Sequence, residues 1–370
     1  MDNTQSHDSG GNLFTSVSVA VVLFFLLSNA LVSGLTDSLM RDGSVLSNAR
    51  YTITQDALRT IAQDDAVSVI GMGSSMTLKS LDGICIGELL EDEVKVYNLA
   101  QSASRAYTDM LHIPRIVDAE PEIVLIEIGA NLLFNTSYTM HPYIQLRFKL
   151  DTMNQESVDI GGWVELIQPN HRGWVALNEI ERMKFKQEYV PSALEEHLLR
   201  SMFDENTSSP DQYGPVPEPG SIDWNDYLQS PNLIDDNKGF DGMSQERRQE
   251  YNDSKMKDSA LMYRPAYRDS QSHHVLDYEI STLLENNIHV IIISPPHHPS
   301  ALTYVEDGQW DGLNETLARY SEWNGVTIFD QTWESGWVDD HFFDRNHLDD
   351  EGRIEFCHRL APVIDQVLNE

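Results

Sequence analysis

A short apolar run that ends in two glycines and a pair of serines constrains this chain most. Residues 66–72 have the sequence AVSVIGM, and Gly73, Ser74 and Ser75 follow. Leu78 to Leu90 then carries apolar residues at a roughly helical spacing. The pattern predicts a strand, a tight turn and a helix that begins near the serines. An α/β protein presents a nucleophile in this way, because the chain reverses at the carboxyl edge of the sheet and a hydroxyl comes to lie at a helix N-terminus.

Two interpretations of this stretch are open. In the catalytic one, Gly71 and Gly73 permit the turn, and the backbone N–H groups of the first helical turn face a developing oxyanion. In the structural one, a serine simply caps a helix that follows a strand, which is a common arrangement. The remainder of the chain distinguishes them.

Strand and helix patterns alternate along the rest of the chain. Besides the run before the serines, apolar runs typical of strands cover residues 94–99, 123–128, 289–294 and 326–329. Helical spacing covers residues 57–61, 107–119, 274–285, 313–323 and 350–368, and a bend is expected at Pro114. This alternation implies a parallel sheet with helices on both faces. Ligands bind such sheets at the carboxyl ends of the strands. The residues expected at that edge are Ser75, Ser102–Ser104, Asn131 and Pro295–His298.

An aspartate and a histidine stand just before the last helical segment. Asp344 precedes His347 by three residues, so its carboxylate can hold the imidazole in one tautomer. The other ring nitrogen is then available to take a proton from Ser75. Taken alone, an Asp–His pair in a loop is usually just solvated.

Four motifs together are more specific than any one of them. They are Gly73–Ser75, Asn98–Ala100 with Ala103, Gly129–Asn131 and Asp344-x-x-His347. In this order they resemble the SGNH (GDSL-like) hydrolase superfamily, over about residues 66–135 and 274–368. The Gly-Ser-Ser variant, the Pro-Pro-His-His-Pro segment at 295–299 and the apolar N-terminal segment are similar to the membrane-linked acyl-transfer branch, which includes proteins of alginate O-acetylation and teichoic acid D-alanylation.

The resemblance implies a role for each matching residue. Ser75 is the expected nucleophile, His347 the general base and Asp344 its orienting carboxylate. The backbone N–H groups of Ser75 and Ala103 and the side-chain amide of Asn131 are expected to form the oxyanion hole. The implied fold is a three-layer α/β/α, flavodoxin-like parallel sheet with a long insertion at about residues 141–272. The implied activity is that of a serine esterase or O-acyltransferase, without cofactor or metal, on an acyl ester of a cell-surface carbohydrate, with acetyl the expected acyl group.

Two departures from the family pattern support an alternative: Ala103 replaces the usual glycine, and Leu132 stands where many members have aspartate. In addition, Ser74 stands in place of the aspartate of the serine motif. None of them removes a member of the triad. The alternative is a catalytically inactive SGNH-like domain that binds surface glycans or scaffolds an envelope complex.

Several other polar or aromatic residues are candidates for the substrate pocket. Three candidates for the pocket lining follow strands: Ser74, His297 and His298. The two histidines have an alternative role, which is to flank a rigid Pro-Pro turn. Trp163 and Trp174 either stack on sugar rings or pack in a hairpin or core, which is the commoner role. No histidine, cysteine or carboxylate spacing indicates a metal site.

Charge and cysteine content limit the partners and the compartment. A formal net charge of −34 argues against nonspecific nucleic-acid binding, which needs a basic face, and suits a saline surrounding. Cys85 and Cys357 are too few for a disulfide framework. Both lie among helical apolar positions, so buried free thiols are the default expectation, and a single bridge between them remains open.

The N-terminus carries an uncharged stretch that is long enough to span a bilayer. We interpret Leu13–Leu35 as a transmembrane helix or signal sequence, preceded by the short polar residues 1–12 and followed by a linker at 36–65 and a catalytic domain at 66–370. Arg41 and Arg50 follow this segment and favour a cytoplasmic domain. The resemblance to envelope acyl-transfer proteins favours the opposite side, so we expect a single-pass membrane protein with an extracytoplasmic domain, close to an envelope-complex partner.

Overall fold

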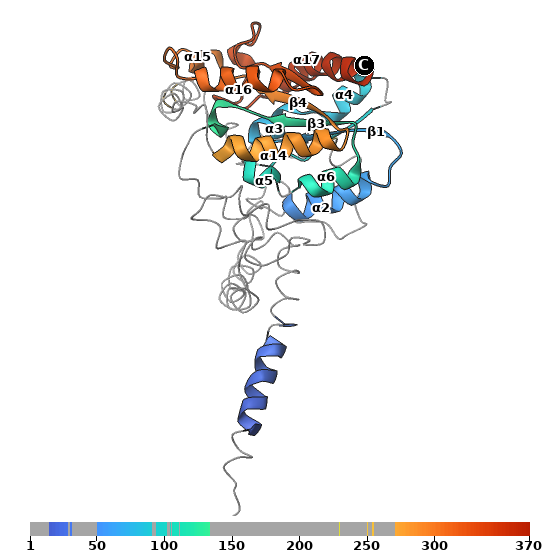
Figure 1. Ribbon diagram of the computed structural model, residues 1–370. Helices are drawn as coiled ribbons and strands as arrows, with labels where there is room; N and C mark the ends of the chain where they lie inside the picture. The colour runs from blue at the N-terminus through green and yellow to red at the C-terminus, as the bar shows by residue number, and fades with distance from the viewer. Residues whose placement is uncertain are drawn as a thin grey trace, which may run out of the picture.

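The computed structural model describes residues 15–28, 30–31, 50–90, 94–101, 104, 106–110, 112–133, 229, 250, 254 and 271–370. Nearly all of the expected insertion at 141–272 lies outside these ranges, as do Trp163, Trp174, Ser102 and Ala103. The described part is an α/β structure built on one parallel sheet (Figure 1).

Five strands form the sheet, in the order β2-β1-β3-β4-β5, and they are β1 Val67–Met72, β2 Val94–Asn98, β3 Ile123–Glu127, β4 His289–Ser294 and β5 Val326–Asp330. Every neighbouring pair is parallel. The predicted parallel sheet is therefore confirmed, and its strand order is one of the two common doubly wound orders. In such a sheet the carboxyl ends of all strands meet at one edge.

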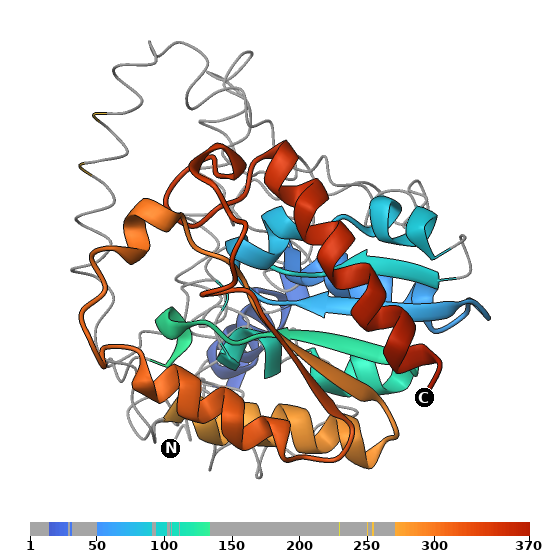
Figure 2. The same cartoon turned by 90° about the horizontal axis from the view of Figure 1, so that it is seen from above.

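Helices cover both faces of the sheet. In chain order the helical elements are α2 Arg50–Ile61, α3 Ser75–Ser80, α4 Gly83–Leu89, α5 Ala106–Met110, α6 Ile113–Ala119, the short 3₁₀ turn η1 Ala130–Leu132, α14 Gln271–Glu285, α15 Pro299–Leu302, α16 Asp311–Ser321, the 3₁₀ turn η3 Asp339–His341 and α17 Asp350–Leu368. Figure 1 shows α17 on one side of the strands and α14, α6 and α2 on the other, and Figure 2 shows α17 running across the strands.

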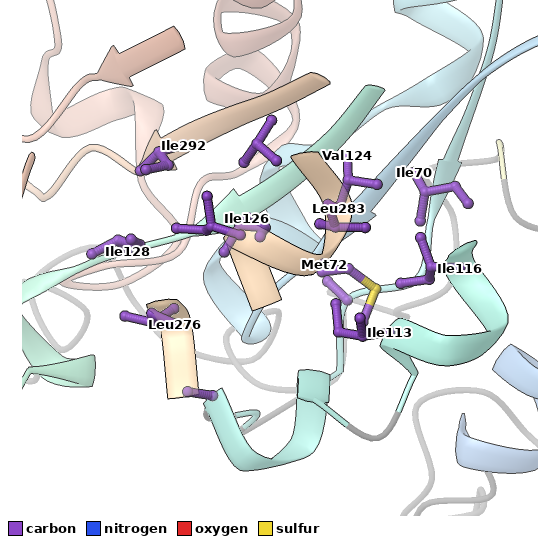
Figure 3. Packing of buried hydrophobic residues seen from close by; sticks show 14 of the residues in the cluster. Ile70, Met72, Ile113, Ile116, Val124, Ile126, Ile128, Leu276, Leu283 and Ile292 are labelled. Atoms are coloured by element: carbon purple, nitrogen blue, oxygen red, sulfur yellow. The ribbon is translucent and has the colours of Figure 1, made fainter. Parts of the chain in front are cut away.

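Alternation along the strands gives each face its own core. On β3, Val124 and Ile126 point into a cluster that includes residues of α2, α6, α14 and α16, whereas Ile123 and Leu125 belong to a second cluster under α17. Figure 3 shows part of the first cluster, with Met72 beside Ile113. Both cores rest on strands that are apolar on both faces, as parallel strands between two helical layers require.

Two predicted helices are each divided in the structure. The helical pattern over Leu78–Leu90 becomes α3 and α4, because Leu81 is extended and Asp82 starts a new helix by accepting a hydrogen bond from the Cys85 N–H at 3.0 Å. The pattern at 107–119 becomes α5 and α6, and Pro114 lies in the first turn of α6 rather than at a bend. By contrast, α2 is longer than predicted.

The two cysteines form a disulfide bond between α4 and α17. Cys85 and Cys357 are 272 positions apart, with 6.3 Å between their Cα atoms. The default expectation of free thiols is therefore wrong, because the fold packs these two helices together on one face of the sheet (Figure 1).

Residues 15–28 and 30–31 are helical and exposed, except that Ser28 is partly covered. Within the ranges that the structure describes, no helix is long and apolar enough to cross a membrane. The expected span at Leu13–Leu35 falls only partly in those ranges and stays a prediction.

Candidate active site

Residues from two distant parts of the chain meet at the carboxyl edge of the sheet. Ser75 is the first residue of α3, directly after the turn that leaves β1. Asp344 and His347 lie in a loop between η3 and α17, which is closed by a bridge between Phe342 and Leu348. The fold thus brings side chains 272 positions apart into contact.

Ser75, His347 and Asp344 form a continuous chain of hydrogen bonds. The His347 Nε2 atom lies 2.8 Å from Ser75 Oγ. The Nδ1 atom of the same ring lies 2.8 Å and 3.0 Å from the two carboxylate oxygens of Asp344. All three residues are partly exposed to solvent. The geometry is that of a nucleophile, a general base and the carboxylate that orients the base.

The carboxylate of Asp344 is held in its charged form. Burial alone raises the pKa of Asp344. Three other effects lower it and outweigh burial: the hydrogen bond from His347, the charge of that imidazole, and hydrogen bonds from the backbone N–H groups of Asn346 and His347. Together they lower the pKa of Asp344 to about 2. At neutral pH a negative charge therefore faces Nδ1, which keeps the proton on that nitrogen and leaves Nε2 free to accept one from Ser75.

The turn that carries Ser75 requires a glycine at position 73. Gly73 has a φ of 152°, and a Cβ atom there would lie 2.6 Å from Thr77 Oγ1 and 2.7 Å from Glu127 Oε2. The helix that follows is capped by Ser74, whose Oγ accepts the Met76 N–H at 3.2 Å. The capping interpretation is therefore confirmed for Ser74, while the catalytic interpretation concerns Ser75 and stays a prediction.

Glu127 is the residue of this site that sequence reasoning missed. It ends β3 and is only 1% exposed. Its carboxylate accepts hydrogen bonds from Ser74 and Thr77, both in the turn that presents Ser75. The available signal was a single acid within the otherwise apolar run IVLIEIG at residues 123–129. A charge at a doubly buried strand position has to be paired with donors.

The residues expected to complete the oxyanion hole are described only in part. The loop after β2 runs beside the serine turn, with the Gln101 N–H donating to the Gly73 carbonyl at 2.8 Å. Ala103, two residues later, lies outside the described residues. Asn131 lies in η1 directly after β3, so its backbone is at the expected edge, while its side chain is not described.

The two histidines after β4 are both buried but have different surroundings. Burial and the nearby charge of His347 lower the pKa of His297 to about 4, so this ring is neutral beside the triad. The Nδ1 atom of His298 accepts the Ser300 N–H at 3.2 Å and caps α15. The His298 N–H donates to the Arg345 carbonyl at 3.1 Å, which ties α15 to the loop of His347.

A row of aromatic rings extends from His297 to the surface. The His297 ring packs against Trp310 with 5.1 Å between centroids, and Trp310 packs against Trp333 at 5.2 Å. Trp333 follows β5 at the same edge of the sheet and is 49% exposed. The row thus links His297, whose pKa is lowered by burial and by the charge of His347, to a partly exposed indole ring at the surface.

Among the described residues, no group of three or more histidine, cysteine or acidic side chains is arranged to hold a metal ion. The arrangement can instead perform acyl transfer through a serine, which requires only a base, an orienting carboxylate and oxyanion donors.

Comparison with known proteins adds no relative: no protein-family model matches the chain, and neither does any curated protein.

Proposed function

We propose that the protein is an SGNH-type serine esterase or O-acyltransferase that acts on an acyl, preferably acetyl, ester of a cell-surface carbohydrate. The observation that carries the proposal is the Ser75–His347–Asp344 chain of hydrogen bonds at the carboxyl edge of a doubly wound sheet. A flavodoxin-like catalytic domain, tethered to the membrane by Leu13–Leu35, belongs to the same proposal.

The reaction follows from the geometry of the three side chains. His347 Nε2 takes the proton of Ser75 as Oγ attacks the acyl carbonyl carbon, and the tetrahedral intermediate carries its negative charge on the former carbonyl oxygen. The imidazolium then gives this proton to the leaving alcohol oxygen as the ester bond breaks. Water or a sugar hydroxyl next loses a proton to His347 and attacks the carbonyl carbon of the acyl-serine. The imidazolium then returns this proton to Ser75 Oγ as the acyl–Oγ bond breaks, which releases acid or a new ester and restores both side chains.

Three groups are proposed to stabilise the oxyanion: the N–H groups of Ser75 and Ala103 and the amide of Asn131. The loss of one such donor typically lowers the rate roughly 100- to 1000-fold. Alanine retains a backbone N–H, so the replacement of glycine by Ala103 is compatible with this role.

The aromatic row supports a carbohydrate as the ester-bearing molecule. Trp333 presents a partly exposed planar face at the same edge of the sheet as Ser75, and the buried ring of Trp310 packs between it and His297. Sugar rings have apolar C–H faces that pack against such aromatic surfaces, while their hydroxyls stay hydrated. Acetylated xylo-oligosaccharides, assayed in parallel with 4-nitrophenyl acetate, test this part of the proposal.

The test of the proposed chemistry is a Ser75→Ala variant of the full-length protein. We expect hydrolysis of 4-nitrophenyl acetate to fall by at least about 1000-fold, because the nucleophile is lost. Ser80→Ala is the matched control, since Ser80 lies on the same helix and its hydroxyl donates to the Met76 carbonyl. Equal rates in Ser75→Ala and the parent would contradict the proposal.

A fluorophosphonate probe separates this enzyme from an inactive binding module. Labelling that depends on both Ser75 and His347 supports the enzyme. Binding of surface glycans by a parent protein that the probe does not label supports the module instead.

A further inference from the structure

We propose that Glu127 is a positioning residue for the nucleophile: its buried carboxylate fixes the turn that presents Ser75 and determines which backbone N–H faces the oxyanion. The inference rests on the proposed function and adds to it a residue that does not touch the substrate. It concerns a side chain on a different strand from the one that leads to Ser75.

Four hydrogen bonds join this carboxylate to the residues that flank Ser75. Oε2 accepts the backbone N–H of Ser74 at 2.7 Å, the N–H of Thr77 at 3.2 Å and the Thr77 hydroxyl at 2.6 Å. Oε1 accepts the Ser74 hydroxyl at 2.7 Å. The Glu127 carboxylate thus binds residues on both sides of Ser75, one position before it and two positions after it.

Because these groups are buried, the hydrogen bonds to the Glu127 carboxylate restrict the geometry of the turn. Glu127, Ser74 and Thr77 are each less than 5% exposed. A charged acceptor forms stronger hydrogen bonds than a neutral one, and its desolvation is offset only when all these bonds are made together. Gly73 contributes by lacking a Cβ atom, which would collide with Glu127 and Thr77. The turn therefore has one arrangement in which the carboxylate is satisfied.

The same bonds remove competing donors from the first turn of α3. The N–H groups of Ser74 and Thr77 are taken by Glu127, and the N–H of Met76 is taken by Ser74 Oγ. Among the described residues, the N–H of Ser75 donates to no acceptor. The expectation that several N–H groups of this turn face the oxyanion is therefore too broad, and the Ser75 N–H is the one that remains.

The experiment compares Glu127→Gln with Glu122→Gln in the full-length protein. A glutamine at 127 presents an NH₂ group to donors, which disturbs the turn while keeping the size of the side chain. Glu122 is the matched control, because its carboxylate accepts a backbone N–H, that of Ser68 at 2.6 Å, at the opposite end of the same sheet. Active sites are counted by fluorophosphonate titration, so that rates refer to folded protein.

We expect kcat per titrated site to fall about 100-fold in Glu127→Gln, with KM changed less than about threefold, because misplacement of a reacting group by about 1 Å has an effect of this size. Glu122→Gln keeps the parent kcat. Thr77→Val, which removes one bond of the four, is expected to lower kcat in the parent but far less in the Glu127→Gln background. If Glu127→Gln does not fold, Ser74→Ala and Thr77→Val carry the same test.

If Glu127→Gln has the same kcat per titrated site as the parent and only a lower melting temperature, the inference is overturned and the proposed function stays intact. A parent protein that neither turns over ester nor reacts with the probe would overturn both. A loss of kcat that is equal in Glu127→Gln and Glu122→Gln would also overturn it, because the effect would then be one of general stability.

Discussion

Two buried carboxyls, Asp109 and Glu279, interact electrostatically with one another, and Asp109 also interacts with Glu127. Burial raises the pKa of Asp109 to about 7, with a further increase from the charge of Glu127 and a decrease from the Ser104 hydroxyl, which donates to it at 2.6 Å. Burial also raises the pKa of Glu279 well above its usual value, and the charge of Asp109 adds to this. There is therefore a range of pH in which these two carboxyl groups are protonated in the folded state and ionised in the unfolded chain.

The sign of the resulting pH dependence follows directly. Because the folded-state pKa of Asp109 exceeds the unfolded value of 3.8, its contribution favours folding at low pH and is lost as the pH rises towards about 7. We expect Asp109→Asn to gain stability relative to the parent over that interval, by up to about 1.4 kcal/mol per pH unit. The depressed pKa of His297 has the opposite effect, but equally in both proteins. Urea unfolding at pH 5, 6, 7 and 8 measures the difference, and a constant difference would contradict the prediction.

Single residues were predictable where chemistry and topology agree. Ser75, Asp344 and His347 each follow an expected strand or precede an expected helix, and a parallel sheet gathers such positions at one edge. Glu127 was not predictable in its role, because a strand pattern shows that an acid is buried without showing which donors it meets. Those donors belong to Ser74 and Thr77, which lie 53 and 50 positions earlier in the chain.

At the level of elements, the strands were easier to predict than the helix boundaries. All five apolar runs are strands, and the pattern is clearest in β3, which is buried along its whole length and is apolar except for Glu127. The break between α3 and α4 was missed, because apolar residues continue through it and only the cap at Asp82 marks the second helix. The same break turns α4 so that Cys85 reaches α17. The bridge could not be read from spacing, as its two ends lie 272 positions apart.

The disulfide joins the helices that follow the two halves of the triad, α4 after Ser75 and α17 after His347. We expect the double variant Cys85→Ala/Cys357→Ala to lose about 2–5 kcal/mol of unfolding free energy, the range usual for a native bridge. Thermal unfolding of the parent with and without dithiothreitol provides the control, because the chain has only these two cysteines. An unchanged melting temperature in both comparisons would show that the bridge contributes nothing to stability.

On the scale of the whole molecule, the bridge and the charge both bear on which side of the membrane the domain occupies. Disulfides persist in oxidising compartments and are rare in a reducing cytosol. A net charge of −34 also suits a saline exterior. Both support the proposed extracytoplasmic location, against the weak orienting effect of Arg41 and Arg50.

Sidedness is tested by adding protease to intact cells that carry the protein with an epitope after Glu370. We expect the epitope signal to be lost while a cytoplasmic control protein stays whole. Loss of the epitope only after lysis would place the domain inside.

The bridge between Cys85 and Cys357 also determines how the molecule responds to a cut in its chain. A break between Cys85 and Asp344 divides the polypeptide into a piece with Ser75 and a piece with His347, yet the two remain one covalent particle. If the break lies between residues 133 and 289, strands β1, β2 and β3 belong to one piece and β4 and β5 to the other, with parallel pairing between β3 and β4 still joining them. A nicked, two-chain form therefore keeps Ser75 and His347 in one particle, and only a reducing gel reveals that the chain has been cleaved.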